Sequence, residues 1–257
     1  MNEFGIDSVQ LSNGQMITQA QIDAITFFIP QVGWLNGAYN ACGTSAFFTK
    51  TMTVYAYSGS SVKAMINNNK YAGVFFFSHA WNAASAIYEA NKTCDILDTY
   101  EVPPNFPVFL DWESTGTPGT GAWNALIHAG ITPTTALIQE VITAWKTRIE
   151  QRGYTAGFYT SGALIDSLVN NTWLQNQRTN NNLYYWEAVL AANPMHDCDI
   201  WQYAHQQEWM NVRYVDYNKI MDDRIFNGGG GSSNIPIWLK IKMARGENQN
   251  AKCTILL

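Results

Sequence analysis

The sequence predicts an α/β fold in which helices surround a parallel sheet or barrel. Three observations lead to this prediction. Strand-like and helix-like segments alternate from Phe4 to Tyr217, an order typical of parallel sheets with crossover helices. The run Val74–Phe77 is continuously apolar, as expected for a strand that is covered on both faces. The segment Pro133–Arg152 has the spacing of an amphipathic helix, which could provide such a cover.

The first half of the chain is expected to supply two strands, one helix and a third strand in that order. Phe4–Val9 is a short apolar segment at the start, and Val74–Phe77 is the next strand. Ala83–Thr99 follows as a helix, because its apolar residues fall on one helical stripe. Pro107–Asp111 is then a strand, and the prolines before it mark its beginning.

The second half begins with the strongest helix pattern, Pro133–Arg152. Thr132 is predicted as its N-cap and Pro133 as its first residue. Thr155–Thr160 is predicted as the next strand. Three shorter strands, with little helix between them, are expected at Tyr184–Leu190, Asp199–Tyr203 and Arg213–Tyr217.

The predicted domain boundary lies late in the chain. Residues 1–227 are assigned to the barrel domain and residues 228–234 to a Gly/Ser linker, either native or left from cloning. Residues 235–257 alternate apolar and polar side chains, which predicts a short C-terminal β-hairpin. A lone hairpin is only marginally stable in water, so we expect it to dock on the main domain or on a partner.

The composition excludes several classes of protein. Charged residues make up 14% of the chain, against roughly 25% in typical globular proteins. The 20 acidic and 15 basic residues give a net charge of −5, which is the wrong sign for a nucleic-acid partner. No apolar run approaches the roughly 20 residues of a membrane helix, and no signal peptide pattern opens the sequence. The four cysteines form no CxxC pair and are expected to be free buried thiols.

Two acidic residues follow the strand Pro107–Asp111 closely enough to share a site. Asp111 and Glu113 are two positions apart, so on an extended chain they face the same side about 6.5 to 7 Å apart. Two carboxyl groups in one cavity resist ionising together, so the pKa of one rises and it can hold a proton. Glycosidases need this division between a proton donor and a carboxylate. The alternative is a pair of solvated acids in a turn.

Two further acids lie on other predicted strands. Asp7 interrupts the first apolar segment, and Asp216 closes the last predicted strand. Each alone could be structural. A barrel brings the ends of its strands together, so Asp7, Asp111, Glu113 and Asp216 become candidate catalytic residues as a set.

Aromatic and polar residues near the strand ends are candidates for substrate binding. Sugar rings have apolar faces that pack on aromatic rings, although core packing remains the alternative for each aromatic residue. His79 could line the cavity or be a packed histidine. The predicted substrate-binding residues are Phe77, His79, Tyr159, Trp186, Trp201, Gln202 and Tyr203.

Other chemistries find no support in the sequence. It contains no GxSxG, Walker or GxGxxG motif. The segment His196–Asp199 carries metal-capable groups but lacks the spacing that would make them converge. We therefore expect no metal and no cofactor.

With these segments and acids in this order, the sequence resembles the glycoside hydrolase family 25 lysozymes, the muramidases common in bacteriophage endolysins. The resemblance runs from Gly5 to about Asn218, and six short motifs occur in the family's order. They are Gly5-Ile6-Asp7, Gly73 to His79 with the alanine-rich helix, Phe109 to Glu113, Gly157 to Ser161, Trp201-Gln202-Tyr203 and Val215 to Asn218.

The resemblance implies an irregular TIM-like (β/α)5(β)3 barrel that needs no cofactor. It implies cleavage of the β-1,4 bond between N-acetylmuramic acid and N-acetylglucosamine in peptidoglycan. Glu113 matches the general acid/base, and Asp111 matches the partner carboxylate that orients the substrate's acetamido group. Asp7 and Asp216 match the remaining acids of the site.

The resemblance also implies a cellular setting. Such an enzyme is made in the host cytoplasm and reaches the bacterial wall through a phage holin or as part of a virion. Residues 235–257 are then a candidate docking segment for a phage tail protein.

The sequence departs from the family at three places near the expected site. Ser8-Val9 replaces the usual Val-Ser, residues 27–33 lack the family's basic residue, and Phe75-Phe76 replaces Tyr-His. Residues 34–60 resemble a reshaped loop. These changes affect the expected glycan specificity more than the acids. The alternative is a non-catalytic glycan-binding protein, or a structural virion protein, with a lysozyme-like barrel.

Overall fold

The computed structural model describes residues 4–8, 11, 14–35, 52–68, 70–113, 122, 126, 130–222 and 224. The predicted linker 228–234 and hairpin 235–257 lie outside the described residues, as do Cys42 and Cys253. The two described cysteines, Cys94 and Cys198, are free and buried.

The described strands belong to one sheet, with the order β4-β3-β6-β7-β8-β9-β10-β11-β1-β2-β5. Their bounds are β1 Phe4–Ser8, β2 Phe27–Phe28, β3 Gln31–Leu35, β4 Met52–Val54, β5 Tyr71–Ala72, β6 Val74–Phe77, β7 Pro107–Asp111, β8 Thr155–Ser161, β9 Tyr184–Ala188, β10 Ile200–Trp209 and β11 Val212–Ile220. The helices are α1 Gln19–Ala24, α3 Ser58–Asn67, α4 Ala83–Thr99, α6 Thr135–Gln151, the short α7 Gly162–Leu164 with a π-helical turn Ile165–Val169, and α8 Asn171–Asn180.

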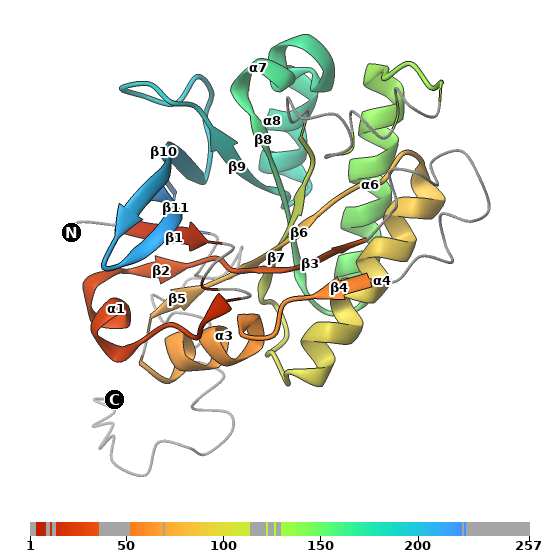
Figure 1. The fold of residues 1–257 in the computed structure, drawn as a ribbon. Coiled ribbons are helices and arrows are strands. Elements are labelled where there is room, and N and C mark those ends of the chain that lie inside the picture. The colour runs from red at the N-terminus through yellow and green to blue at the C-terminus, as the bar shows by residue number, and fades with distance from the viewer. Residues whose placement is uncertain are drawn as a thin grey trace, which may run out of the picture.

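The sheet curls round on itself (Figure 1). β1 pairs with β11 in antiparallel orientation and with β2 in parallel orientation. Only Ile29 and Pro30 separate β2 from β3 along the chain. β3 pairs in parallel with β6, and parallel pairing then continues from β6 through β7, β8 and β9 to β10. Helices follow β1, the β2–β3–β4 segment, β5–β6, β7 and β8, whereas β9, β10 and β11 follow one another without a described helix. This confirms the predicted irregular TIM-like (β/α)5(β)3 arrangement.

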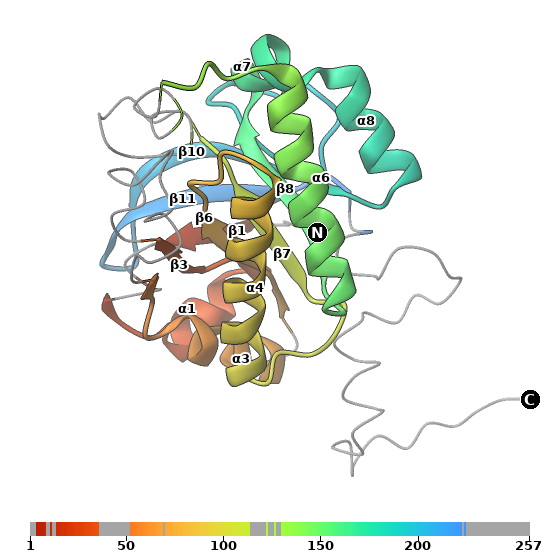
Figure 2. The ribbon, with the colours of Figure 1, turned by 90° about the vertical axis from the view of Figure 1, so that its right-hand side faces the viewer.

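The helices are arranged around the outside of the curled sheet in a half-barrel, with α1 and α3 below it, and β10 and β11 form the side opposite α4 and α6 (Figures 1 and 2). α4 and α6 pack side by side over the strands of the parallel region. A large apolar core fills the space between the sheet and the helices. α6 contributes one stripe of apolar side chains to this core. That stripe is Ile138, Val141, Ile142, Trp145 and Ile149.

The inner face of the sheet has a second, smaller apolar core. On β7, Val108 and Leu110 point to the helices, whereas Phe109 points inward among the residues of this inner core. The inward-facing Gly157 of β8 leaves room for it, since a Cβ there would lie 2.3 Å from the Phe109 ring. Asp111 lies two residues after Phe109 on the same face of β7, and Tyr159 lies two residues after Gly157 on the same face of β8. The apolar core therefore forms a floor beneath the strand ends.

Gly157→Ala is expected to destabilise the protein by about 2 kcal/mol, because the new methyl group overpacks the inner core. Gly73→Ala is the matched control, since a Cβ at that position meets its nearest atoms at 3.4 to 3.5 Å, an ordinary contact. Urea unfolding of the two variants beside the wild type measures the difference. Equal midpoints for the two alanine variants would contradict the close packing of Phe109 on Gly157.

Several predicted boundaries were wrong. The helix predicted over Pro133–Arg152 begins at Thr135, because Thr134 rather than Thr132 is its N-cap and accepts the Leu137 N–H at 3.3 Å. β10 and β11 are longer than predicted, since they pair with each other as a hairpin up to Trp209 and Val212. Residues 34–60 are not all loop, because they include the end of β3, the strand β4 that pairs with it, and the start of α3.

Helices α1, α3, α7 and α8 had no predicted counterpart. α8 buries only Leu174, so its sequence shows hardly any apolar stripe. α1 spans 6 residues and is fixed by a capping box between Thr18 and Gln21.

Candidate active site

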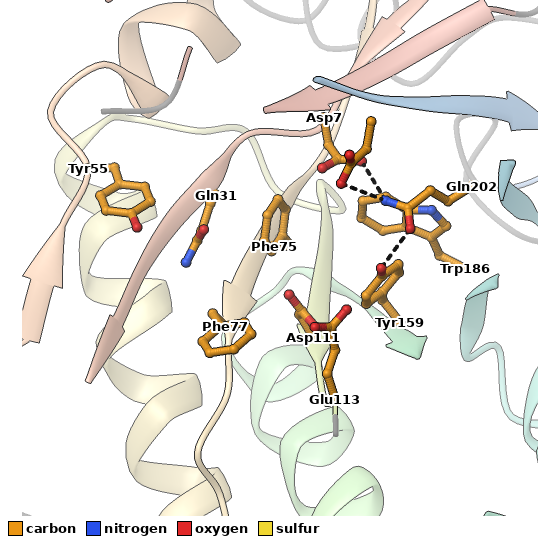
Figure 3. Close-up of a pocket in the computed structure, with 11 residues that line it drawn as sticks. Asp7, Gln31, Tyr55, Phe75, Phe77, Asp111, Glu113, Tyr159, Trp186 and Gln202 are labelled. Atoms are coloured by element: carbon orange, nitrogen blue, oxygen red, sulfur yellow. Dashed lines mark hydrogen bonds between the residues drawn. The ribbon is translucent and has the colours of Figure 1, made fainter. Parts of the chain in front are cut away.

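A cavity of about 340 Å³ opens above the inner apolar core, towards the carboxyl ends of the parallel strands. Figure 3 shows its lining: acids and Gln202 stand on one side, and Gln31 and Tyr55 on the other. The described lining residues are Asp7, Gln31, Tyr55, Phe75, Phe77, Asp111, Glu113, Tyr159, Trp186, Gln202 and Asp216. The four acids predicted from the sequence therefore lie in one cavity, and no described lysine or arginine lines it.

Asp7 and Asp216 are brought together by the pairing of β1 with β11. They are direct partners in the antiparallel register, a position in which like charges repel. Two side-chain amides relieve this repulsion. Gln202 Nε2 donates to Asp7 Oδ2 at 3.3 Å and to Asp216 Oδ2 at 3.2 Å, and Asn218 Nδ2 donates to Asp7 Oδ2 at 2.8 Å. The Gln206 backbone N–H also donates to Asp216 at 2.7 Å.

Asp111 and Glu113 are held by the backbone at the end of β7. The Asp111 carbonyl accepts the Ser78 N–H at 2.9 Å, and the Trp112 N–H donates to the Tyr159 carbonyl at 3.1 Å. The buried Trp112 side chain points away from the cavity, and its Nε1 donates to the Ala80 carbonyl at 3.2 Å. With Trp112 fixed in this way, its two neighbours turn towards the cavity, as the spacing of two predicted.

Burial raises the pKa of all four acids above their ordinary values. For Asp7 the charge of Asp216 adds to burial, while the Asn218 and Gln202 amides oppose it. For Asp111, after burial, the charges of Glu113, Asp7 and Asp216 all raise the pKa. Burial is also the main cause for Glu113 and Asp216. The cluster therefore retains protons at pH values where isolated carboxyl groups have lost them.

Aromatic rings form the lower wall of the cavity. Tyr159 and Trp186 pack edge to face with ring centroids 4.6 Å apart, and Phe75 packs on Trp186 at 5.9 Å. The polar atoms of the first two are engaged: the Tyr159 hydroxyl donates to Gln202 Oε1 at 2.8 Å, and Trp186 Nε1 donates to Asn218 Oδ1 at 2.9 Å. These rings therefore orient the amides that contact the acids.

Three predicted substrate-binding residues are not in the described lining of the cavity. Alternation along β10 turns Gln202 inward, so Trp201 and Tyr203 face the other side, where their rings pack at 5.4 Å. Trp201 Nε1 donates there to the Val189 carbonyl at 2.9 Å. His79 is 1% exposed behind Phe77, and burial lowers its pKa to about 4. The structure thus gathers Phe77, Tyr159, Trp186 and Gln202 with the acids, but not these three.

The metal-capable segment His196–Asp199 is engaged in protein contacts. His196 lies between Glu187 and Asp166, with ring nitrogens 2.5 and 2.9 Å from their carboxyl oxygens. Asp199 is paired with Arg178 and Arg224. Across the part of the chain that the structure describes, no three His, Cys, Asp or Glu side chains are grouped as metal ligands. No helix in that part has the length and apolarity needed to cross a membrane.

Four residues at the site were not predicted as site residues. Phe75 shares a strand face with Phe77, so its position followed from the alternation of that strand. Asn218 was part of a motif without an assigned role. Gln31 and Tyr55 gave no signal, because the pairing of β3 with β6, and not a local pattern, brings this edge to the cavity.

No protein-family model and no curated sequence relative matches this chain. Solved structures do. The CTP1L endolysin superposes with a TM-score of 0.62 at 17% identity, over 95% of this chain and 70% of that one. The GHIP glycosyl hydrolase 25 of Streptococcus pneumoniae gives a TM-score of 0.57 at 14% identity, over 88% and 91%.

The modular autolysin LytC of Streptococcus pneumoniae matches with a TM-score of 0.59 at 15% identity, over 84% of this chain. The matched region is 46% of the length of LytC, so the present chain corresponds to about half of that protein. LytC has also been solved with a synthetic peptidoglycan ligand. At these identities the likeness shows the fold, and the chain has a glycoside hydrolase family 25 lysozyme-type fold.

Proposed function

We propose that this chain, with its family 25 lysozyme-type fold, is a peptidoglycan hydrolase that cleaves the β-1,4 bond between N-acetylmuramic acid and N-acetylglucosamine. The observation that carries the proposal is the meeting of Asp7, Asp111, Glu113 and Asp216 in one cavity without a described lysine or arginine. Four carboxyl groups of raised pKa provide both halves of glycosidase chemistry, a proton for the leaving oxygen and negative charge for the developing cation.

In this proposal Glu113 is the general acid. It is the one member of the four that stands beyond the end of its strand, at the margin of the buried cluster, where a glycosidic oxygen can reach it. Asp111, 5% exposed and deeper in the cavity, orients the acetamido group of the substrate. Asp7 and Asp216 supply negative charge that favours an oxocarbenium-like transition state.

The lower wall of the cavity and the wall opposite the acids are proposed to bind the sugar rings. Phe75 and Phe77 offer apolar surface, while Gln31 and Tyr55 offer uncharged hydrogen-bonding groups. A neutral sugar with one apolar face fits this wall better than a phosphate or a nucleotide, which would need cations.

Mass spectrometry of digested peptidoglycan tests the proposal. Purified cell walls are incubated with the protein, reduced with borohydride and hydrolysed. Cleavage of the proposed bond leaves N-acetylmuramic acid at the new reducing ends, so muramitol should increase over a digest without protein. An increase in glucosaminitol would assign the other glycosidic bond. No new reducing ends would contradict a glycosidase and favour the glycan-binding or structural alternative.

The phage setting is part of the same proposal, and it is supported by likeness to the CTP1L endolysin and to the catalytic domain of endolysin ply40 of bacteriophage P40. The chain would act on the bacterial wall after release by a holin or from a virion, with residues 235–257 docking on a tail protein. Proteomic analysis of purified virions distinguishes the two routes, because only a virion component co-purifies with the particles.

A further inference from the structure

Glu89 is a fully buried acid that the proposed chemistry does not use. It lies on α4, is 0% exposed and is not among the described residues that line the cavity. Within the described part of the chain, no lysine, arginine or histidine forms a salt bridge with it. A buried carboxyl group without a cation costs stability, which points to a role in holding its neighbours.

The two carboxyl oxygens of Glu89 hold the loop between β6 and α4. The Ser78 hydroxyl donates to Oε2 at 2.6 Å, and the His79 backbone N–H donates to Oε1 at 2.9 Å. The Ser78 hydroxyl oxygen in turn accepts the Ala80 backbone N–H at 3.0 Å. All three loop residues are buried, so these bonds form in a region of low dielectric, where they are strong. Glu89 therefore fixes the path of the chain directly after β6.

The same loop contacts the segment that carries two of the candidate catalytic acids. The Ser78 backbone N–H donates to the Asp111 carbonyl at 2.9 Å, and the Ala80 carbonyl accepts the Trp112 indole N–H at 3.2 Å. Trp112 stands between Asp111 and Glu113 in the sequence, and its ring is fully buried in the large apolar core. The loop therefore holds the backbone at one acid and the side chain between both.

β8 holds the same segment from its other side, but through the backbone. The Trp112 N–H donates to the Tyr159 carbonyl at 3.1 Å, and the Trp112 carbonyl accepts the Thr160 hydroxyl at 2.7 Å. These two bonds fix the backbone of Trp112, whereas the bond to Ala80 fixes its ring. Rotation of the chain at this residue, which sets the direction of the acids on either side, is thus restrained from β8 and from the loop that Glu89 anchors.

We propose that Glu89 is a positioning residue for Asp111 and Glu113, which it holds through residues 78–80 and Trp112. Its carboxyl group anchors the loop to α4, and the loop sets the angle at which the two acids enter the cavity. The catalytic meaning of this support rests on the proposed function, whereas the contacts themselves do not. α4 thereby has a second role besides covering the sheet.

Two substitutions separate the hydrogen bonds of Glu89 from its bulk. Glu89→Met keeps the length of the side chain but lacks both carboxyl oxygens. Glu89→Gln keeps an acceptor for the His79 N–H, and its NH2 group can donate to the Ser78 hydroxyl oxygen. A neutral replacement suits this position, because burial raises the pKa of Glu89 to about 8 and leaves the group mostly uncharged at neutral pH. We therefore expect Glu89→Met to release the loop and Glu89→Gln to keep it.

NMR of the free protein follows the loop directly. In Glu89→Met the indole N–H signal of Trp112 should move upfield, and the Ser78 backbone N–H should exchange with solvent about tenfold faster, the change expected from one lost hydrogen bond. Glu89→Gln should keep both signals of the wild type. Thr93→Val is the matched control and should also keep them. Thr93 is a buried polar residue one turn farther along α4, and its hydroxyl donates within the helix, to the Glu89 carbonyl at 2.9 Å.

The catalytic readout is the division of the effect between kcat and KM on soluble glycan fragments of peptidoglycan. Glu89→Met should lower kcat by about 10- to 100-fold with little change in KM, because misplaced acids slow the chemical step, whereas Glu89 itself does not line the cavity. Glu89→Gln should recover most of the lost rate. Thr93→Val should keep both constants, since it alters the core of α4 but not the loop.

Near-ultraviolet circular dichroism checks that each variant is folded. If Glu89→Met does not fold, Ser78→Ala takes its place, because it removes the hydroxyl that joins Glu89 to Ala80. An unchanged Trp112 signal or an unchanged kcat in the Met variant overturns the proposal, as does an equal loss in Thr93→Val.

The two readouts keep this proposal separate from the proposed function. The NMR measurements need no substrate. The expected spectral changes, together with a wild-type protein that cleaves no peptidoglycan, would support the fixed placement of the acids and reject the hydrolase activity. Cleavage by the wild type, with Glu89→Met equally fast, would reject the positioning role and leave the hydrolase activity standing.

Discussion

Glu113→Gln should reduce the rate of new reducing-end release from purified peptidoglycan by about 10³-fold, within the range that general acid catalysis supplies. Glutamine keeps the size of the side chain but has no proton of suitable acidity to give to the leaving oxygen. Glu208→Gln is the matched control, because Glu208 is an exposed glutamate on β10. A Glu113→Gln protein that releases reducing ends at the wild-type rate removes Glu113 from the mechanism.

The same variant should be more stable than the wild type at neutral and higher pH. Burial raises the pKa of Glu113 in the folded protein, so the folded state binds the proton more tightly than the unfolded chain does. For such a group, stability is lost as the pH rises from the unfolded pKa through the folded one. The neutral amide avoids this loss. The advantage in melting temperature should therefore vanish below the ordinary pKa of glutamate, near pH 4.3, and a melting series across pH measures it.

The parts of the fold that were predictable are those in which local pattern and burial agree. β6 and β7 are covered on both faces, so their sequences are continuously apolar, and α4 and α6 each turn one clear stripe to the sheet. The pattern was weak where an element is short or mostly polar. β2 consists of Phe27 and Phe28 alone, with β3 following two residues later. Such a strand is recognisable only from its pairing with neighbours far away in the sequence.

The four acids could be located because strand ends converge in a barrel whatever the details of its register. The aromatic residues could not be sorted in this way. Trp186 and Trp201 both lie on late strands, but Trp186 faces the inner core and Trp201 the outer one. Which of two faces a residue takes depends on the register between strands, and a shift of one residue reverses it. The local sequence pattern therefore could not predict which aromatic residues line the cavity.

The side-chain amides of the site could not be predicted from the sequence either. Asparagine and glutamine give little signal in a sequence, because they are common on surfaces. Gln202 and Asn218 gain their roles from being direct cross-strand partners on β10 and β11, next to Asp7 and Asp216 on the paired β1 and β11. The contacts of Asp7 with Gln202 and Asn218 join residues 195 and 211 positions apart, and only the curled sheet brings them together.

Asp199→Ala should destabilise the protein by about 3 kcal/mol, the largest stability change predicted for this chain. Asp199 is fully buried and accepts five hydrogen bonds with its carboxylate, from Arg178, Arg224 and the Tyr185 backbone, at 2.6 to 3.2 Å. Its backbone carbonyl accepts the N–H groups of Met221 and Asp222 as well. Asp199 thus joins the start of β10 to β9 and to the segment after β11. Alanine leaves two arginines, whose side chains are 15% and 26% exposed, with Asp222 as their remaining described carboxylate partner.

Asp95→Ala provides the comparison, because it removes a carboxylate that is 57% exposed and pairs with Arg152 at 3.1 Å. Exposed pairs contribute about 0 to 1 kcal/mol, so urea unfolding should separate the two variants clearly. If Asp199→Ala loses no more unfolding free energy than Asp95→Ala, then Arg178 and Arg224 turn to solvent at little cost in stability. Gln202 lies on β10, three residues beyond Asp199, yet its amide is fixed by Tyr159, Asp7 and Asp216. Well below its melting temperature, Asp199→Ala should therefore release reducing ends from peptidoglycan at the wild-type rate, which separates the stability of the barrel from the chemistry of its acids.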